Sequence, residues 1–144
     1  MERGWHEAYH AQDMAPLDPA SLGHVAADDF ERIIFTPHPS LRLLSSPFPA
    51  LSIWQMNIDE GVPQPIEFDQ PENAVFLRPS AEVQVRLVKD ASFAFLKNLA
   101  RGETVVAALR AAARKDEMFD LGTNLAELFG LGAFVQWRLG EKYD

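Results

Sequence analysis

The 144-residue sequence contains no cysteine, which excludes disulfide bonds, thiolate metal sites and cysteine nucleophiles. It also has no apolar run near the roughly 18 residues of a membrane-spanning helix. No basic segment followed by an apolar core opens the sequence, as a secretory signal would. We therefore expect a cytoplasmic protein that makes no membrane contact.

Basic residues are scarce as well. The chain has 13 Lys and Arg against 21 Asp and Glu, a formal net charge of -8 at pH 7. Such a balance repels phosphate backbones and anionic lipids unless a local basic patch overrides it. The sequence also lacks a glycine-rich phosphate loop and a serine in a nucleophile-elbow context. We therefore expect no catalytic residues, no cofactor and no enzymatic activity.

What the sequence does contain is enough apolar material for one globular core. Hydrophobic residues make up 47% of the chain and aromatic residues 10%, at a length typical of a single domain. Prolines interrupt the first part repeatedly, and prolines 37 and 39 force an extended stretch around His38, which we expect to be a turn residue bonded to backbone. We divide the chain into an N-terminal lead-in segment, residues 1–40, and a domain over residues 41–140.

A β-hairpin is predicted over residues 74–88. The first strand is the apolar run 74–77, and Pro79 favours a turn after it. The second strand shows the period of two of a half-buried strand. Its alternation sets Val83, Val85 and Leu87 against Gln84, Arg86 and Val88. Residues 41–44 are expected to add a further strand.

Three short helices are predicted after the hairpin. Asp90 is a candidate N-cap for a helix over residues 91–101, and Gly102 follows as a C-cap. Thr104 caps a second helix that breaks at Asp116, and Asp120 caps a third. The predicted fold class is α+β and winged-helix-like, with a small antiparallel sheet of about three strands followed by three short helices.

Residues 47–56 carry aromatic bulk that we expect to fill core. Leu51, Trp54 and Ile58 fall on one helical face, whereas Ser52 and Gln55 fall on another. This division predicts that Trp54 is buried. Residues 57–73, rich in proline and acidic or amide side chains, are expected to form a surface loop.

Residues 6–10 spell HExxH, a motif that on a helix presents two imidazoles to zinc and a glutamate as general base. His24, Asp28 or Asp29 could supply a third ligand, but the spacing singles out none of them. Pro16 also limits the helix to a few turns. A chance match on an exposed terminal helix is the alternative that we favour, so no metal site is assigned and an HExxH-type metal-dependent hydrolase stays a second alternative.

Two family resemblances are visible in the sequence. The hairpin, "ASFAFLKNLARGETVVAALRAAA" and "LAELFGLGAFV" resemble the winged-helix peptide-recognition domains of the PqqD type. Over nearly the whole chain, "AYHAQDMAPLD", "HPSLRLLSSPFPALSIW", "FLRPSAEVQVRLV" and "FLKNLARGETVVAALRAA" resemble the C-terminal part of the bacterial HvfC/BufC-like family, to which the methanobactin partner protein MbnC is distantly similar. Members of that family usually carry a further N-terminal domain to which DNA binding is attributed, and this sequence has no counterpart of it.

The resemblance implies a non-catalytic partner protein in RiPP biosynthesis. Such a protein would bind the leader part of a precursor peptide and act with a multinuclear-iron enzyme of the MbnB type. The peptide would add a strand to the hairpin and reach toward the third helix. The implied peptide-binding residues are Glu82, Val83, Gln84, Val85, Arg86, Leu87 and Val88 on the hairpin, with Leu121, Leu125 and Leu128 beside the groove; core packing is the alternative for the leucines.

A DNA-binding winged helix is the alternative function. Such a protein neutralises phosphates with Lys and Arg and presents donors to base edges from a recognition helix. The third predicted helix carries Asp120 and Glu127, and no Lys or Arg lies between Lys115 and Arg138. We therefore expect that this chain does not bind nucleic acid.

Overall fold

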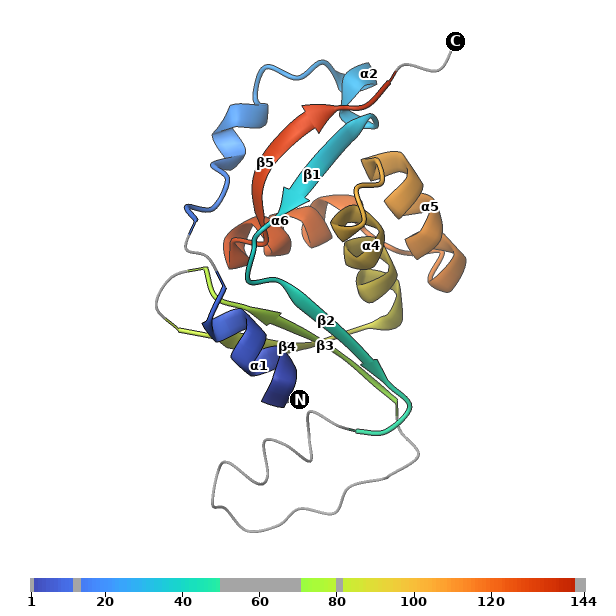
Figure 1. Ribbon diagram of the computed structural model, residues 1–144. Coiled ribbons are helices and arrows are strands. Elements are labelled where there is room, and N and C mark those ends of the chain that lie inside the picture. The colour runs from blue at the N-terminus through green and yellow to red at the C-terminus, as the bar shows by residue number, and fades with distance from the viewer. Residues whose placement is uncertain (1, 12–13, 50–70, 80–81, 142–144) are drawn as a thin grey trace.

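The computed structural model describes residues 2–11, 14–49, 71–79 and 82–141 (Figure 1). In this part the chain forms five α-helices, one short 3-10 helix and two antiparallel sheets. The helices are α1 (Glu2–Tyr9), η1 (Pro19–Leu22), α2 (Ala27–Phe30), α4 (Asp90–Ala100), α5 (Val105–Lys115) and α6 (Leu121–Leu131). The predicted α+β class, with a three-stranded sheet followed by three short helices, is confirmed.

The three-stranded sheet has the order β2 (Arg42–Ser46), β3 (Glu72–Leu77) and β4 (Gln84–Val88). Its register pairs Val75 with Arg86 and Phe76 with Val85, so the hairpin predicted from alternation is confirmed. β4 is an edge strand of this sheet. The strand expected at residues 41–44 is also present, shifted to Arg42–Ser46.

A second sheet, which the sequence analysis did not predict, joins the two ends of the described chain. β1 (Ile33–Pro37) pairs antiparallel with β5 (Phe134–Leu139), and the register shifts between Thr36 and Pro37. In Figure 1 this pair lies at the opposite end of the fold from the three-stranded sheet. The segment expected to be a lead-in, residues 1–40, thus supplies a strand and contributes Ile33 and Phe35 to the core.

The three helices after the hairpin begin and end close to where their caps predict. Thr104 Oγ accepts a hydrogen bond from Ala107 N at 3.2 Å and so caps α5, which ends at Lys115. Asp120 caps α6 in the same way. The prediction for Asp90 was off by one residue: Lys89 is the N-cap of α4 without a side-chain bond, and Asp90 lies in the first turn. There its carboxylate accepts from Asn73 Nδ2 at 2.7 Å, which links the helix to β3.

The main core lies between the two sheets and the three helices. Phe35 and Phe134 stack with ring centroids 4.6 Å apart, and Phe95 packs against Phe119 at 5.1 Å. Leu99 and other side chains from α4, together with small residues of α5, fill the space beside them. The buried residues of α5, Val105, Ala108 and Ala112, recur at helical spacing and so share one face of the helix.

Helix α1 covers the other face of the three-stranded sheet (Figure 1). Ala8, Ala74 and Phe76 form a second buried cluster there, with Trp5 packed at its margin. Gly4 permits the close approach, because a Cβ at this position would lie 2.9 Å from the Phe76 ring. The short N-terminal helix expected from the sequence is therefore confirmed, and it packs on the sheet.

His38 and Ser40, both buried, connect four segments of the chain. His38 N donates to Ala133 O at 2.7 Å, and its Nε2 lies 2.9 Å from Met14 O. Its Nδ1 accepts from Ser40 N at 3.0 Å, and Ser40 Oγ accepts from Arg78 N at 2.7 Å. The prediction that His38 is a turn residue bonded to backbone is confirmed.

Two further sequence predictions concern membrane spans and the segment of residues 47–73. No helix among the described residues is long and apolar enough to cross a membrane. The predicted burial of Trp54 falls on residues 50–70, which lie outside the described part of the chain, as does most of the loop expected over residues 57–73. The end of that loop was wrong, because Glu72 and Asn73 already belong to β3 and pair with β2 and β4.

Gly132 and Gly130 provide a matched test of the end of α6. Gly132 has φ +74, and a Cβ there would lie 2.8 Å from Pro79 Cβ. Gly132→Ala should therefore destabilise the protein by more than the roughly 1–2 kcal/mol cost of a left-handed residue. Gly130 lies within the helix, and a Cβ added there would have no neighbouring atom within 4 Å, so Gly130→Ala should stabilise by up to about 1 kcal/mol. Urea denaturation measures both, and equal midpoints would contradict this account.

Candidate functional site

A groove of about 470 Å³ lies between β4 and α6. Its walls come from the edge strand and from one face of the helix, and β3 and α4 contribute to the lining between them. The lining residues are Val75, Arg86, Leu87 and Val88 from the sheet, Ser92 and Leu96 from α4, and Asn124, Glu127, Leu128, Gly130 and Leu131 from α6. Mostly apolar walls with a few polar groups are typical of a binding site.

The backbone of β4 is the first notable feature of this groove. Within the described residues β4 pairs with β3 alone. Alternate residues of an antiparallel edge strand leave their N–H and C=O groups unpaired on the outer side. The groove therefore lies beside a row of backbone donors and acceptors, an arrangement that suits an added strand.

Two opposite charges lie in the lining. Arg86 is on β4 and Glu127 is on α6, and both side chains are exposed. Neither forms an ion pair with any residue that the structure describes. Both charges are therefore available to a molecule that enters the groove.

The position of α6 is fixed by polar contacts at its N-terminus. Asp120 accepts hydrogen bonds from Thr123 Oγ at 2.9 Å and from Thr123 N at 3.3 Å. These bonds, the hydroxyl first, hold the pKa of the Asp120 carboxyl below its usual value. Asn124 donates to Asp120 O and accepts from Ser92 Oγ, each at 2.7 Å, so the helix is tied to α4 at one end of the groove.

The structure brings part of the predicted peptide-binding set together. Arg86, Leu87 and Val88 on β4 line the groove, and Leu128 lines it from α6. Leu87 is 50% exposed, and its side chain is on the same face of the sheet as its cross-strand partner Ala74, away from the groove. The predicted strand and the predicted helix therefore do flank one groove.

The remaining predicted residues do not line the groove. Val83 and Val85 pack with the cluster under α1, on the opposite face of the sheet. Leu125 is buried in the main core, and Leu121 packs against that core. For these two leucines the structure therefore shows core packing, the alternative to peptide binding. Glu82 and Gln84 are exposed at the start of the strand.

On the α6 wall of the groove, the sequence analysis predicted Leu128 but not Asn124, Glu127 or Leu131. Asn124, Glu127, Leu128 and Leu131 are spaced i, i+3, i+4 and i+7, so they share one face of the helix. The prediction followed the more apolar stripe through Leu125, which faces the core. Helical spacing could have found the second face, but only with the knowledge that β4 lies opposite it.

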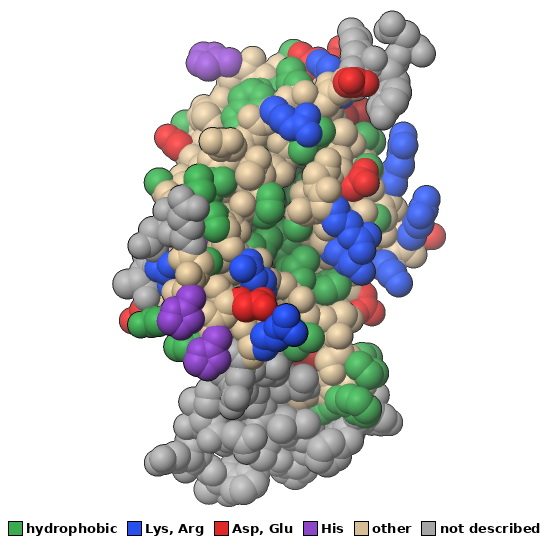
Figure 2. Space-filling view, in the orientation of Figure 1, with side chains coloured by type: hydrophobic (Ala, Val, Ile, Leu, Met, Phe, Trp, Pro, Cys, Tyr) green, Lys and Arg blue, Asp and Glu red, His purple; other side chains and the backbone are tan. Residues whose placement is uncertain are grey.

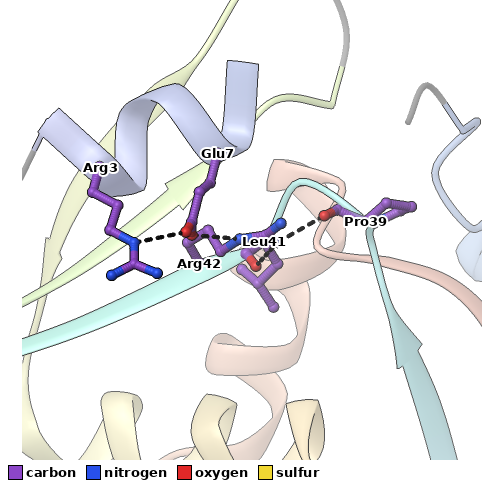
Figure 3. A network of polar contacts seen from close by, with 5 residues as sticks. All are labelled: Arg3, Glu7, Pro39, Leu41 and Arg42. Carbon is purple, nitrogen blue, oxygen red and sulfur yellow. Dashed lines mark hydrogen bonds and ion pairs between the residues drawn. The ribbon is translucent and has the colours of Figure 1, made fainter. Parts of the chain in front are cut away.

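The HExxH motif begins on α1, far from the groove in sequence. Glu7 Oε1 accepts from Arg3 Nε at 3.1 Å, and Oε2 accepts from Arg42 Nε at 3.0 Å (Figure 3). The hydrogen bond from Arg3 lowers the pKa of Glu7 most, and the bond from Arg42 lowers it further. Desolvation raises the pKa by less than the Arg3 bond lowers it, so the pKa stays below its usual value. A carboxylate bound in this way is a poor general base. In the described part of the chain, no group of three or more His, Asp or Glu side chains is arranged to hold a metal.

Comparisons with known proteins add no identification. No family model matches this chain, and a search of curated proteins finds no match. The functional implications of the sequence resemblance are therefore proposals, to be judged against the groove itself.

The cap of α6 makes the stability of this groove wall depend on pH. Because the pKa of Asp120 is lowered in the folded protein, its contribution is present near neutral pH and is lost as pH falls through the folded pKa. Asp120→Ala should have a lower urea midpoint than the parent at pH 7, and the difference should shrink in acid. Asp120→Asn keeps a good capping acceptor without a titrating group, so it should hold the pH 7 midpoint better than Asp120→Ala. Equal midpoints for Asp120→Ala and the parent at pH 7 would contradict this role.

Proposed function

We propose that this protein is a cytoplasmic, non-catalytic partner that binds a ribosomally made precursor peptide by strand addition. The observation that supports the proposal is the groove between β4 and α6, with an unpaired strand edge along one wall. In the proposed complex an extended peptide lies against β4 and exchanges backbone hydrogen bonds with it. The peptide side chains that point inward then pack between Val88 and Leu128.

The size and chemistry of the groove fit such an occupant. At about 470 Å³ it has room for a few side chains, and its apolar lining supplies affinity through burial. A strand-added peptide directs alternate side chains to the same face, so every second residue would enter the groove. Arg86 and Glu127 at the rim favour a peptide that places an acidic and a basic side chain opposite them.

The second half of the proposal concerns the partner enzyme. The sequence resemblance suggests that the bound peptide is presented to a multinuclear-iron enzyme of the MbnB type, which carries out the modification. A peptide-binding protein without its own catalytic centre is consistent with Glu7 being engaged by Arg3 and Arg42. In this division of labour the chain supplies recognition, and the enzyme supplies the chemistry.

DNA binding, the alternative, has less support from the distribution of charge. Five exposed cations lie together on α4, α5 and the turn between them: Lys97, Arg101, Arg110, Arg114 and Lys115. Figure 2 shows Lys and Arg side chains gathered on that side of the molecule. The helix α6, which would be the recognition helix of a winged-helix domain, carries Glu127 and no cation. Its exposed face would therefore repel a phosphate backbone.

The peptide proposal is tested with any short precursor peptide that is encoded beside the gene. Calorimetric titration should show saturable binding, and Val88→Asp should weaken it about tenfold or more by placing a charge in the apolar groove, a loss of about 1.4 kcal/mol. Leu139→Asp is the matched control. Leu139 is 39% exposed on β5, in the other sheet, and its change should leave binding unaltered.

A backbone-modified peptide separates strand addition from simple apolar contact. Two peptides are compared, each N-methylated at every second residue but offset from the other by one residue. One lacks the amides that face β4, and the other lacks those that face away from it. One of the two methylated peptides should lose binding and the other should retain it. No heat for the unmodified peptide at high micromolar concentration, or equal loss with both methylated forms, would count against strand addition.

The DNA alternative makes the opposite prediction. We expect no shift of duplex DNA by the protein at sub-micromolar concentration, because the net charge of -8 and the acidic α6 oppose binding. A gel-shift assay at low and at physiological salt measures this. A salt-sensitive shift at sub-micromolar protein that is lost when Arg110 and Arg114 are changed to Glu would favour nucleic acid instead.

A further inference from the structure

Two histidines lie one helical turn apart at the N-terminus, His6 on α1 and His10 just after it, and neither ring bonds to a described residue. The chain has four histidines. His38 is buried, with both ring nitrogens bonded, and His24 lies alone in the turn after η1. His6 and His10 are both exposed, and neither makes a hydrogen bond through its ring to a described residue. Figure 2 shows histidine side chains next to each other on the surface over this part of the molecule.

The i, i+4 spacing of the pair brings the two imidazoles near enough to share one metal. His10 N donates to His6 O at 3.0 Å, so the helical turn between the two residues is closed. Their rings are nearly parallel, at an interplanar angle of 6°, with centroids 6.3 Å apart. Two imidazoles on a tetrahedral zinc, with Zn–N bonds of about 2.0–2.1 Å, bring their ring centroids to roughly 5 Å. The stacked rings must also turn so that a nitrogen of each points at the metal, and since both side chains are exposed this breaks no hydrogen bond to a described residue.

The helix that carries the pair is held in place on the sheet. The Arg78 guanidinium donates to Ala8 O and Ala11 O at the end of α1, and Glu7 binds Arg42 of β2. Gly4 packs directly on Phe76 at the other end of the helix. The backbone that spaces the two imidazoles is therefore ordered before any ligand arrives, which lowers the entropic cost of binding.

The donor set defines the class of ligand. Neutral imidazole suits Zn²⁺, Cu²⁺ and Ni²⁺, whereas Ca²⁺ and Mg²⁺ prefer oxygen ligands. Glu7 points to Arg3 and Arg42 (Figure 3), so it does not complete the set. We propose that His6 and His10 form a two-imidazole site for a borderline divalent cation such as Zn²⁺, with water or a partner side chain completing the coordination. The site binds a metal without the general base that hydrolysis by an HExxH motif requires.

Zinc titration of protein purified without a histidine tag tests the proposal. Calorimetry should show one saturable Zn²⁺ site. Loss of an outer-shell partner alone typically weakens metal binding about tenfold or more, so removing one of two direct ligands in His6→Ala or His10→Ala should cost at least that. Thermal melts in the presence of a chelator should show that both variants fold like the parent, since both side chains are exposed.

Two matched controls make the assignment specific. His24→Ala removes an exposed histidine outside α1 and should leave Zn²⁺ affinity unchanged. Glu7→Gln removes the carboxylate of the motif and should also retain binding, because Glu7 is not a ligand in this proposal. Absence of saturable Zn²⁺ binding by the parent, equal binding by His6→Ala and His10→Ala, or loss of binding in Glu7→Gln would each overturn it. Peptide binding in the groove is independent of this result.

Discussion

The fold depends on the buried imidazole of His38, which satisfies backbone groups from separate parts of the chain. Met14 O can only accept a hydrogen bond and Ser40 N can only donate one, so Nε2 carries the proton and Nδ1 is the acceptor. The backbone N–H of the same residue binds Ala133 O, where α6 turns into β5. One residue, through its imidazole and its backbone N–H, thus joins the N-terminal segment, the connection between the two sheets and the end of the last helix. No buried side-chain polar atom among the described residues lacks a partner.

The same contacts fix the two walls of the groove relative to each other. Ser40, bonded to His38, accepts from Arg78 N at the end of β3, and β3 carries β4 as its neighbour. On the other side, His38 binds Ala133, just beyond the C-terminus of α6. The distance between β4 and α6 is therefore set by a rigid polar node and by the apolar floor of Val75 and Leu96. A groove supported in this way is open before a ligand binds, which favours affinity.

The sequence predicts local structure well here because local chemistry determines it. Thr104 and Asp120 identify helix starts through side-chain bonds within three residues, and alternation identifies β4. The sheet of β1 and β5 escaped prediction because its pairing joins opposite ends of the chain and because the prolines around His38 indicate a turn more strongly than a strand. Half of the groove was missed for a related reason. The side of α6 that faces β4 depends on tertiary packing, and the most apolar stripe of the helix was already used by the core.

The edge of β4 shows how a strand can remain available without promoting aggregation. Exposed edges invite pairing with other chains, and proteins limit this with short strands, charged side chains and covering elements. β4 spans only Gln84–Val88, carries Arg86 at its centre, and has α6 across the groove from it. A flat strand from another folded protein would have to enter between two walls and bury Arg86 or Glu127 unpaired, which is costly. A single extended segment with complementary charges would avoid both penalties, so the features that protect the edge would also favour the proposed peptide.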